Sequence, residues 1–363
     1  MEISVLRTDD AFLALRPQWK ALIDQVPSAS VFLSWEWQYL WWQHYQGNSS
    51  LFLLVCKENE QLCGIAPFYI DHRKPLHLFS QRVVRFIGTG GDTSPDYLDV
   101  ISPPEYSAKC CASILAFLFD HTREWDSLAF NDMESSSLFL KQIIEKNTHH
   151  PSLHVQRKDS SIYYNKLPNT WDEYRASLSK NRRGQINHRR NALKKSGELI
   201  FGYCQSSEEF DTAFEQLIAL HTARWRQKNR NHSFQSKQYI HFHRAVIQQL
   251  SDINAVQLTY LKLNDQYIAV QYWYLWNERM YFFQSGFSPL YQRFSPGLVL
   301  MAHSIEFAIE KGMREIDMLK GDHEYKRSFA KELRPIVSIE CAQPSFLTDL
   351  KRVKNQMRLL LAK

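Results

Sequence analysis

Glycine is scarce in this sequence, with 12 glycines in 363 residues, about half of the roughly 7% that globular chains usually carry. Gly88–Gly90 begins a Gly-x-Gly element, but Thr93 occupies the position of the third glycine in the dinucleotide-binding fingerprint. Gly197 and Gly202 have the spacing of a P-loop, but Tyr203 follows where that loop requires a lysine. The pattern Gly-x-Ser-x-Gly is absent as well, which excludes the nucleophile elbow of hydrolases.

Long apolar runs and closely paired cysteines are also missing. Ile114–Phe119 is among the longest apolar runs, far below the roughly 18 to 20 residues of a membrane-spanning helix. The six cysteines show no Cys-x-x-Cys spacing and lie mostly in apolar stretches, which predicts reduced core thiols. Met1–Val5 is acidic and lacks the pattern of a signal peptide. We therefore expect a soluble, cytoplasmic protein.

The overall composition is that of an ordinary globular protein. Hydrophobic residues make up 44%, and 44 Lys and Arg against 38 Asp and Glu give a net charge of +6. At this length two domains are the default expectation. Lys166–Thr170, with a proline at its centre, is the best candidate for a linker. We predict one domain over residues 1–168 and a second over residues 169–363.

The second half of the chain alternates between strand and helix patterns. Ser206 and Glu209 have the spacing of a capping box, and Ser295-Pro296 supplies an N-cap and a first helical residue. The predicted order is strand 199–204, helices 206–226 and 236–250, strands 256–263, 267–276 and 279–285, helix 295–312, strand 315–319, helix 325–331 and strand 335–341.

The first half of the chain shows a similar order. It comprises strand 3–6, helices 9–23 and 34–45, strands 51–57, 62–70 and 83–88, helix 105–119, strand 127–130, helix 135–145, and strands 153–157 and 161–164. Helices and strands that are interleaved in this way predict an α/β fold, of the α+β kind, with a mixed sheet.

The segment after strand 279–285 is a candidate anion site. A helix that begins at Ser295 exposes unpaired amides and a partial positive charge. Arg293 adds a full charge, Gly297 leaves room for a ligand beside the backbone, and Gln284 precedes them in the strand. The alternative interpretation is a well-capped helix with no ligand.

A run of ionisable residues follows strand 315–319. Loops at strand ends often hold catalytic groups, and Asp322, Glu324, Tyr325 and Lys326 follow Gly321 here. A tyrosine hydroxyl can act as a general acid, and a lysine ammonium can stabilise an oxyanion. A solvated charged turn is the alternative.

Residues 180–195 form a basic run without a single acidic residue. Its seven cations account for the whole positive excess of the chain: Lys180, Arg182, Arg183, Arg189, Arg190, Lys194 and Lys195. On a helix the two arginine pairs, seven positions apart, share one face. Such a stripe suits the phosphates of a nucleotide, a tRNA or a lipid surface, and the alternative is a solvated helix face.

The aromatic residues after Trp35 and the histidines are weaker indications of a functional site. Trp35 begins a helix with several aromatic residues, one of which can line a groove, although core packing is the favoured explanation of the cluster. The histidines lack Cys or carboxylate partners at ligand spacing. We therefore expect no metal site.

Ile316–Lys326 closely resembles the motif F-D-x-L-x-G-x-x-x-Y-K of a bacterial branch of the GNAT N-acetyltransferase superfamily. That branch is associated with cellulose and exopolysaccharide biosynthesis and is related to the Fem-type aminoacyl transferases, which are tandem GNAT domains. Four further segments resemble this branch: Phe32–Trp35, Arg85–Gly88, Asp96–Asp99 and Leu178–Arg183. The resemblance implies two tandem GNAT-like domains and substrate contacts from Trp35, Asp96, Tyr97, Arg182 and Arg183.

The resemblance also implies an activity: transfer of an acetyl group from acetyl-coenzyme A to a sugar or cell-envelope precursor. The acceptor would attack the donor directly in a cleft between the domains, with no metal. Lys326 would stabilise the oxyanion, Tyr325 would protonate the leaving group, and Asp322 or Glu324 would act as base or orient the acceptor. Gln284, Arg293, Ser295 and Gly297 would face the donor.

The donor loop departs from the pattern of the superfamily. The usual R/Q-x-x-G-x-G/A is replaced by Gln292–Gly297 with a single glycine, and Pro296 lacks an amide donor. Another acyl-CoA or an aminoacyl-tRNA, as in a Fem-like transferase, therefore stays open, as does a non-catalytic scaffold of a polysaccharide system. The basic run 180–195 fits any phosphate-bearing donor and also a peripheral contact with a membrane.

Overall fold

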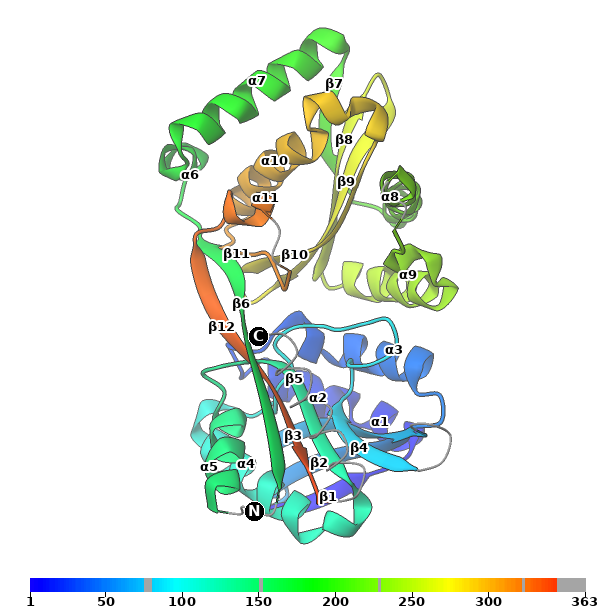
Figure 1. Ribbon diagram of the computed structural model, residues 1–363, viewed down its shortest axis with the longest axis vertical. Coiled ribbons are helices and arrows are strands. Elements are labelled where there is room, and N and C mark those ends of the chain that lie inside the picture. The colour runs from blue at the N-terminus through cyan, green and yellow to red at the C-terminus, as the bar shows by residue number, and fades with distance from the viewer. Residues whose placement is uncertain (75–79, 150–152, 228–229, 322–323, 345–363) are drawn as a thin grey trace, which may run out of the picture. The chain divides into compact units, whose positions relative to one another are not determined.

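The computed structural model describes residues 1–74, 80–149, 153–227, 230–321 and 324–344 (Figure 1). It divides into two compact units, one made of Met1–Ser160 with Pro335–Lys363 and the other of Ser161–Arg334. Two strands, β6 (His154–Lys166) and β12 (Glu332–Ala342), carry the chain across the boundary between the units. The domain boundary expected after residue 168 stays a prediction.

The first unit is a mixed sheet with helices. Its strands follow the order β1-β2-β3-β4-β5-β12, in which β4 and β5 are parallel. The elements are β1 (Glu2–Leu6), α1 (Asp9–Ala14), α2 (Arg16–Ile23), η1 (Val31–Leu33), α3 (Trp35–Tyr45), β2 (Ser50–Glu58), β3 (Gln61–Arg73), β4 (Gln81–Phe86), α4 (Pro104–Asp120), η3 (Thr122–Glu124), β5 (Ser127–Glu134) and α5 (Leu138–His149).

Two details of the first half differ from expectation. The helix expected over residues 9–23 breaks at Leu15 into two helices, because Pro17 lies at the start of the second and has no amide to continue the first. The two short strands expected at 153–157 and 161–164 form the single strand β6. All six cysteines are buried free thiols, as predicted.

The second unit follows the predicted order of strands and α-helices from residue 199 to residue 327. Its elements are α6 (Trp171–Ser177), α7 (Lys180–Ser196), β7 (Leu199–Tyr203), α8 (Ser207–Gln227), η4 (Ser233–Gln235), α9 (Lys237–Ser251), β8 (Val256–Leu263), β9 (Gln266–Trp276), β10 (Arg279–Phe287), η5 (Pro289–Phe294), α10 (Pro296–Glu310), β11 (Glu315–Asp317) and α11 (Glu324–Arg327). Helices α6 and α7 and the short 3-10 helices η4 and η5 are additional to the predicted order, and the predicted last strand, β12, lies mostly in the first unit. The strand order is β6-β11-β10-β9-β8-β7.

Tight turns fix the register of the β8-β9-β10 meander. Both residues of each turn, Asn264-Asp265 and Asn277-Glu278, have positive φ angles between 46° and 60°. Asn and Asp tolerate this left-handed conformation, which two-residue hairpin turns of type I′ require. Strands β8, β9 and β10 are therefore joined by two tight hairpins.

Helices cover both faces of this sheet (Figure 1). Helices α8 and α9 lie on one face, where Phe214 of α8 contacts Tyr272 of β9. Helix α10 lies on the other face, where Met301 and Ile305 join Trp273 in one buried cluster. This burial on both faces makes β9 and β10 the centre of the second unit.

Candidate functional site

Strands β10 and β11 separate soon after they begin. They pair in parallel only over Arg279–Tyr281 and Glu315–Asp317. Strand β10 has a bulge between Phe282 and Gln284 and then continues along β9 to Phe287. Within the described part of the chain no strand pairs with the other edge of residues 283–287. Beyond this short pairing, the edge of β10 that faced β11 therefore has no strand partner among the described residues. Open sheets often bind ligands at such a place, where two parallel strands separate at their carboxyl ends.

The segment after β11 is a tight turn held by Lys326. Leu319 and Gly321 have φ angles of 51° and 121°. The Lys326 ammonium donates to the carbonyl oxygens of Leu319 and Lys320 at 3.1 and 2.9 Å, and the residue is only 5% exposed. Lys326 therefore fixes the backbone of this turn, a contact that the sequence analysis did not anticipate.

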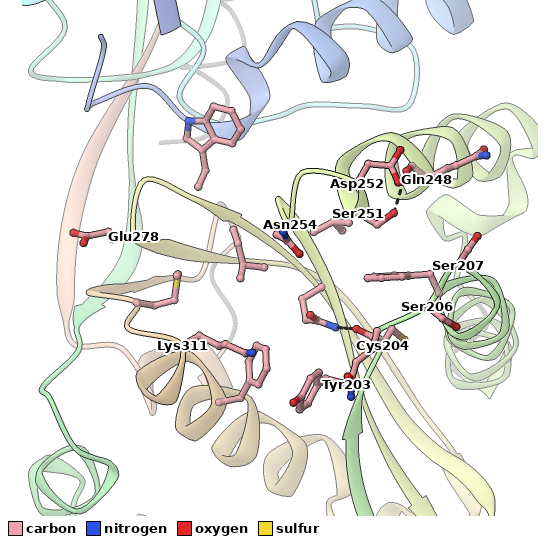
Figure 2. A pocket seen from close by; sticks show the side chains of 18 of the residues that line it. Tyr203, Cys204, Ser206, Ser207, Gln248, Ser251, Asp252, Asn254, Glu278 and Lys311 are labelled. Carbon is pink, nitrogen blue, oxygen red and sulfur yellow. Dashed lines mark hydrogen bonds between the residues drawn. The ribbon is translucent and has the colours of Figure 1, made fainter. Parts of the chain in front are cut away.

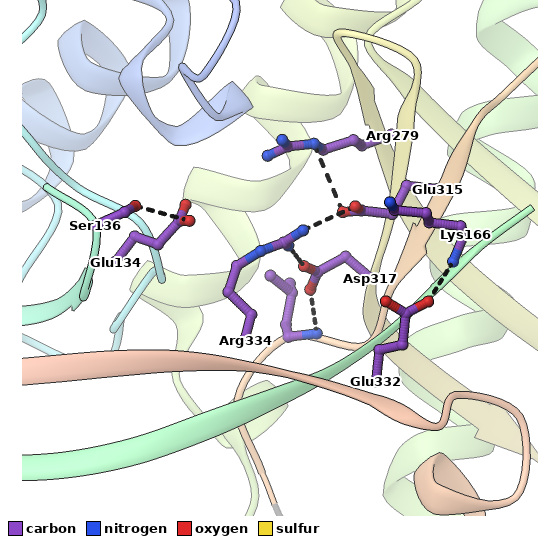
Figure 3. Close-up of polar contacts among 9 residues, drawn as sticks. Glu134, Ser136, Lys166, Arg279, Glu315, Asp317, Glu332 and Arg334 are labelled. Atoms are coloured by element: carbon purple, nitrogen blue, oxygen red, sulfur yellow. Dashed lines mark hydrogen bonds and ion pairs between the residues drawn. The ribbon is translucent and has the colours of Figure 1, made fainter.

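A buried ionic cluster supports the base of the turn (Figure 3). The Arg334 guanidinium donates to Asp317 Oδ2 and Glu315 Oε2, both at 2.7 Å, and lies 4.2 Å from the centre of the Tyr164 ring. Arg279 Nε approaches Glu315 at 3.5 Å. Asp317 Oδ1 also accepts the amide of Leu319 at 2.8 Å. The cluster thus joins β10, β11 and the start of β12 to the turn.

Sequence reasoning missed Arg334 and Glu315. Arg334 lies 17 residues after Asp317, and only the fold brings the two together. The one signal in the sequence is that Glu315 and Asp317 lie two positions apart in a predicted strand and therefore share one face of it.

The predicted anion site lies at η5 and the start of α10. Ser295 is the N-cap residue but has a left-handed conformation, with φ 52°, and makes no side-chain capping bond. The amides of Ser295 and Leu298 donate to the carbonyls of Gln292 and Ser295. Because Pro296 has no amide hydrogen, Gly297 supplies the amide that this turn offers to a ligand.

Space and side chains around Gly297 agree with a ligand there. A Cβ atom at Gly297 would meet only Phe287, at an ordinary 3.5 Å. Gln284 lies on β10, where its Oε1 accepts the amide of Ser285 at 3.0 Å. Arg293 is exposed, with its guanidinium 4.6 Å from the centre of the Phe294 ring.

Helix α7 brings part of the basic run to this site. Arg189 donates from its guanidinium to the carbonyl oxygen of Arg293, so the Arg189 guanidinium lies against the backbone just before α10. The other predicted pair is placed differently. Arg183 donates to the carbonyls of Ala176 and Leu178, both at 2.8 Å, and closes the end of α6. Arg182 lies over the Phe329 ring at 5.6 Å.

The residues predicted to bind substrate in the first unit are buried. Trp35 stacks on Tyr39 at 4.5 Å and donates to the carbonyl of Phe12 at 3.2 Å, which are the contacts of a core residue. Asp96 and Tyr97 are 3% and 7% exposed, and Tyr97 has a positive φ of 64°. Tyr97 is the more informative of them, because backbone strain of this kind often accompanies function.

Tyr97 lines a hollow of about 280 Å³ in the first unit, together with Asp99. Burial raises the pKa of Asp99 to about 6. Glu134, also in the lining, accepts a hydrogen bond from Ser136 at 2.9 Å (Figure 3). Carboxyl and hydroxyl groups dominate the polar lining, and the chemistry suits a ligand with hydrogen-bond donors.

Three predicted catalytic residues belong to the segment at α11. Asp322 lies outside the described residues, whereas Glu324 and Tyr325 begin the short helix α11. Their roles stay predictions.

Two kinds of feature, clusters of metal ligands and membrane-spanning helices, are absent from the described residues. Across those ranges, no three or more His, Cys, Asp and Glu side chains gather as a metal site would require. None of the helices described there is both long and apolar enough to cross a membrane.

Comparisons with known proteins agree with this geometry. Residues 180–327, less than half of the chain, match the family model described as an acetyltransferase (GNAT) domain. The crystal structure of FemX has a TM-score of 0.60 at 10% identity, over 93% of this chain and 97% of FemX. No curated protein sequence matches the chain.

Two further solved structures share the fold. One is the C-terminal domain of an Agrobacterium fabrum protein provisionally named lysylphosphatidylglycerol synthetase, with a TM-score of 0.54 at 9% identity, over 96% of both chains. The other is a Bacteroides thetaiotaomicron protein of unknown function, with a TM-score of 0.53 at 12% identity, over 94% of this chain and all of that one.

These likenesses define the class of fold. Residues 180–327 of the second unit are similar to the GNAT acetyltransferase domain, and the chain as a whole shares its fold with FemX. The fold class predicted from the sequence, a mixed α/β sheet in two GNAT-like domains, is confirmed.

Proposed function

We propose that the protein transfers an acetyl group from acetyl-coenzyme A to an amine or hydroxyl of a sugar or cell-envelope precursor. The observation that carries this proposal is that Arg189 contacts the Arg293 backbone just before α10, while Gly297 in the first turn of α10 lies beside Phe287 at the end of β10. Two guanidinium groups and a helix N-terminus attract a pyrophosphate. An open strand edge offers hydrogen bonds to a ligand that itself carries amides, as the pantetheine arm of coenzyme A does.

The residues present fit this donor in part. Arg189 and Arg293 would hold the pyrophosphate, and the amide of Gly297 would replace the several amides of a glycine-rich loop. Residues 283–287 would pair with the pantetheine amides. The thioester supplies an activated carbonyl, so the acceptor forms the new C–N or C–O bond while the C–S bond breaks and a thiol leaves.

The chain's own groups support that step from the turn after β11. We assign oxyanion stabilisation to Lys326, protonation of the thiolate to Tyr325, and removal of the acceptor proton to Asp322 or Glu324. Positioning of the two substrates supplies much of the rate, and no covalent enzyme intermediate is required. Asp317 and Arg334 act as positioning residues, because they hold the turn that precedes these groups.

Calorimetric titration with acetyl-coenzyme A tests the donor assignment. Arg189→Gln and Arg293→Gln should each weaken binding about tenfold, because each removes a charge-assisted contact worth about 1.5 kcal/mol. Lys195→Gln, near the C-terminal end of α7, is the matched control and should bind as the wild type does. Equal affinity of all four proteins would refute the assignment.

Two conservative variants test the roles at α11. Tyr325→Phe should lower the turnover number with little change in donor affinity. Lys326→Met should lower both turnover and stability, because Lys326 also holds the carbonyls of Leu319 and Lys320. Full transferase activity in both variants would contradict the roles given to them.

A Fem-like transfer from aminoacyl-tRNA is the second candidate. The likeness to FemX and the cations along α7 favour it. It predicts RNA binding that weakens steeply with salt, and neutralising Arg182, Arg183, Arg189 and Arg190 should abolish that dependence. Acetyl-coenzyme A binding without RNA binding would reject this candidate, whereas the reverse result would reject the first. Binding of neither donor would leave a non-catalytic scaffold role.

A further inference from the structure

A second site lies in the same unit, at the opposite end of α10 from Gly297. It is a hollow of about 740 Å³ (Figure 2), within the range of ligand sites. Its base is formed by the ends of β7, β8 and β9, and its sides by the start of α8 and the end of α9. Gly297 and Lys311 are 14 positions apart, which at the rise of a helix is about 20 Å. The hollow is therefore distinct from the proposed phosphate site.

Uncharged hydrogen-bonding groups dominate the polar lining of the hollow. Carboxamides come from Gln205, Gln248, Asn254 and Gln257, and hydroxyls come from serines at the ends of α8 and α9. Carboxamides offer both donors and acceptors, and hydroxyls do the same. Such a lining matches a ligand whose own groups both donate and accept, which is the property of a sugar hydroxyl.

One of these carboxamides is held in place before any ligand arrives. Gln257 Nε2 donates to the carbonyls of Cys204 and Leu258, at 2.9 and 3.1 Å. Both amide hydrogens are thereby engaged, which fixes the direction of Oε1 as an acceptor. A preoriented acceptor lowers the entropy cost of binding.

A partly exposed aromatic ring, that of Tyr203, lies beside these polar groups, tilted by 44° against the buried ring of Phe307. The rings of Tyr203 and Phe307, both in the lining, lie 4.8 Å apart. Lys311 Nζ lies 5.5 and 5.6 Å from their centres, so the charge of Lys311 is engaged over the rings. The C–H face of a pyranose can pack against the exposed part of the Tyr203 ring, with the carboxamides of the same lining available to its hydroxyls.

The charges in the lining argue against other ligand classes. Asp252 and Glu278 outnumber the single cation, Lys311, so a phosphate or nucleotide would meet net repulsion. The many amides and hydroxyls would lose their hydration without compensation against an apolar ligand. We therefore propose that this hollow binds a neutral saccharide. This site goes beyond the proposed transfer reaction and does not depend on it.

Saturation-transfer NMR and calorimetry with the full chain test this proposal. The probes are neutral oligosaccharides of glucose and of N-acetylglucosamine, added without an acyl donor, with inorganic phosphate as the charged competitor. We expect at least one saccharide series to bind and phosphate not to displace it. Failure of every saccharide to bind, or displacement by phosphate, would overturn the proposal. Because no donor is present, neither result depends on whether the protein is an acetyltransferase.

Matched variants on α9 locate the binding. Gln248 and Gln249 are neighbours and both exposed, but only Gln248 lines the hollow. Gln248→Ala should weaken saccharide binding about fivefold to tenfold, the effect of one lost hydrogen bond, whereas Gln249→Ala should have no effect. Tyr203→Leu should weaken binding by removing the aromatic surface. Unchanged binding in both Gln248→Ala and Tyr203→Leu would overturn the assignment to this hollow.

Discussion

At the scale of single residues, the ionic cluster around Arg334 is the most tightly constrained part of the candidate site. Asp317 is fully buried, and Arg334 and Glu315 are nearly so. Charges removed from water are stable only when their partners remain in place. The cluster therefore ties the site to the stability of the second unit.

Arg334→Met should destabilise the protein by about 3 to 5 kcal/mol, since it leaves two buried carboxylates without their partner. Urea denaturation measures the change. Arg244→Met is the matched control, because Arg244 pairs with Glu215 at an exposed position, and exposed pairs contribute about 1 kcal/mol or less. Similar losses in the two variants would contradict the importance given to burial.

His221 should make stability depend on pH. Burial, followed by the nearby His232 and Arg224, lowers the pKa of His221 from its usual 6.5 to about 3. Between these two values the unfolded chain binds a proton that the folded protein does not, so stability falls as the pH decreases from about 6.5 towards 3.

His221→Phe should reduce this dependence and leave the part that comes from His303, whose pKa burial lowers to about 4. At pH 5 the group costs the wild type about 2 kcal/mol by linkage, a cost that the variant avoids. The variant also loses the bond in which Trp225 Nε1 donates to His221 Nε2 at 2.9 Å, so its stability at pH 7 should be lower. Urea denaturation at pH 7 and pH 5 measures both effects. An unchanged difference between the two pH values would rule out His221 as the cause.

The sequence predicts single residues well only where their contacts are with near neighbours along the chain. The motif Ile316–Lys326 predicts a turn after a strand, and the structure has that turn. The contacts of Lys326 with its own turn and of Arg189 with Arg293 depend on side-chain directions and helix packing. A one-dimensional pattern does not contain that information.

At the scale of elements, Gly286 lies where strand β10 and helix α8 approach each other closely. A Cβ atom at Gly286 of β10 would lie 2.7 Å from the amide nitrogen of His221 and 2.9 Å from the carbonyl oxygen of Leu217, both on α8. By contrast, Gly184 on α7 has nothing within 4 Å of that position.

Two alanine substitutions should therefore have opposite effects. Gly286→Ala should destabilise by about 1 to 3 kcal/mol, because backbone atoms of α8 must shift. Gly184→Ala should stabilise by about 1 kcal/mol, since alanine favours an exposed helix interior. Thermal denaturation compares the two with the wild type. A stabilising Gly286→Ala would contradict the close approach of α8 to β10.

The elements themselves follow from sequence patterns where the determinants are local. The capping box at Ser206 forms the predicted bond to the amide of Glu209 at 3.3 Å, although Glu209 caps Gln205 rather than Ser206 in return. The separation of β10 from β11 is harder to predict from the sequence, because it depends on a bulge in β10 and on the residue at which β11 ends. Strand propensity describes neither feature.

At the scale of the whole molecule, the two units carry different candidate functional features. The second unit carries the match to the GNAT domain, the open edge of β10 and the cations of α7. The first unit carries the strained Tyr97 and the hollow with Asp99. The order of helices and strands along the sequence predicts the fold class. The choice of donor depends instead on the turn before α10, where Pro296 has no backbone amide to offer to a phosphate.

Hydrogen–deuterium exchange with and without saturating acetyl-coenzyme A tests the central claim most directly. If the donor binds along β10 and at the start of α10, peptides that cover residues 283–287 and 296–299 should become protected, and Arg293→Gln should reduce that protection. Unchanged exchange in both segments at saturating donor would contradict the account.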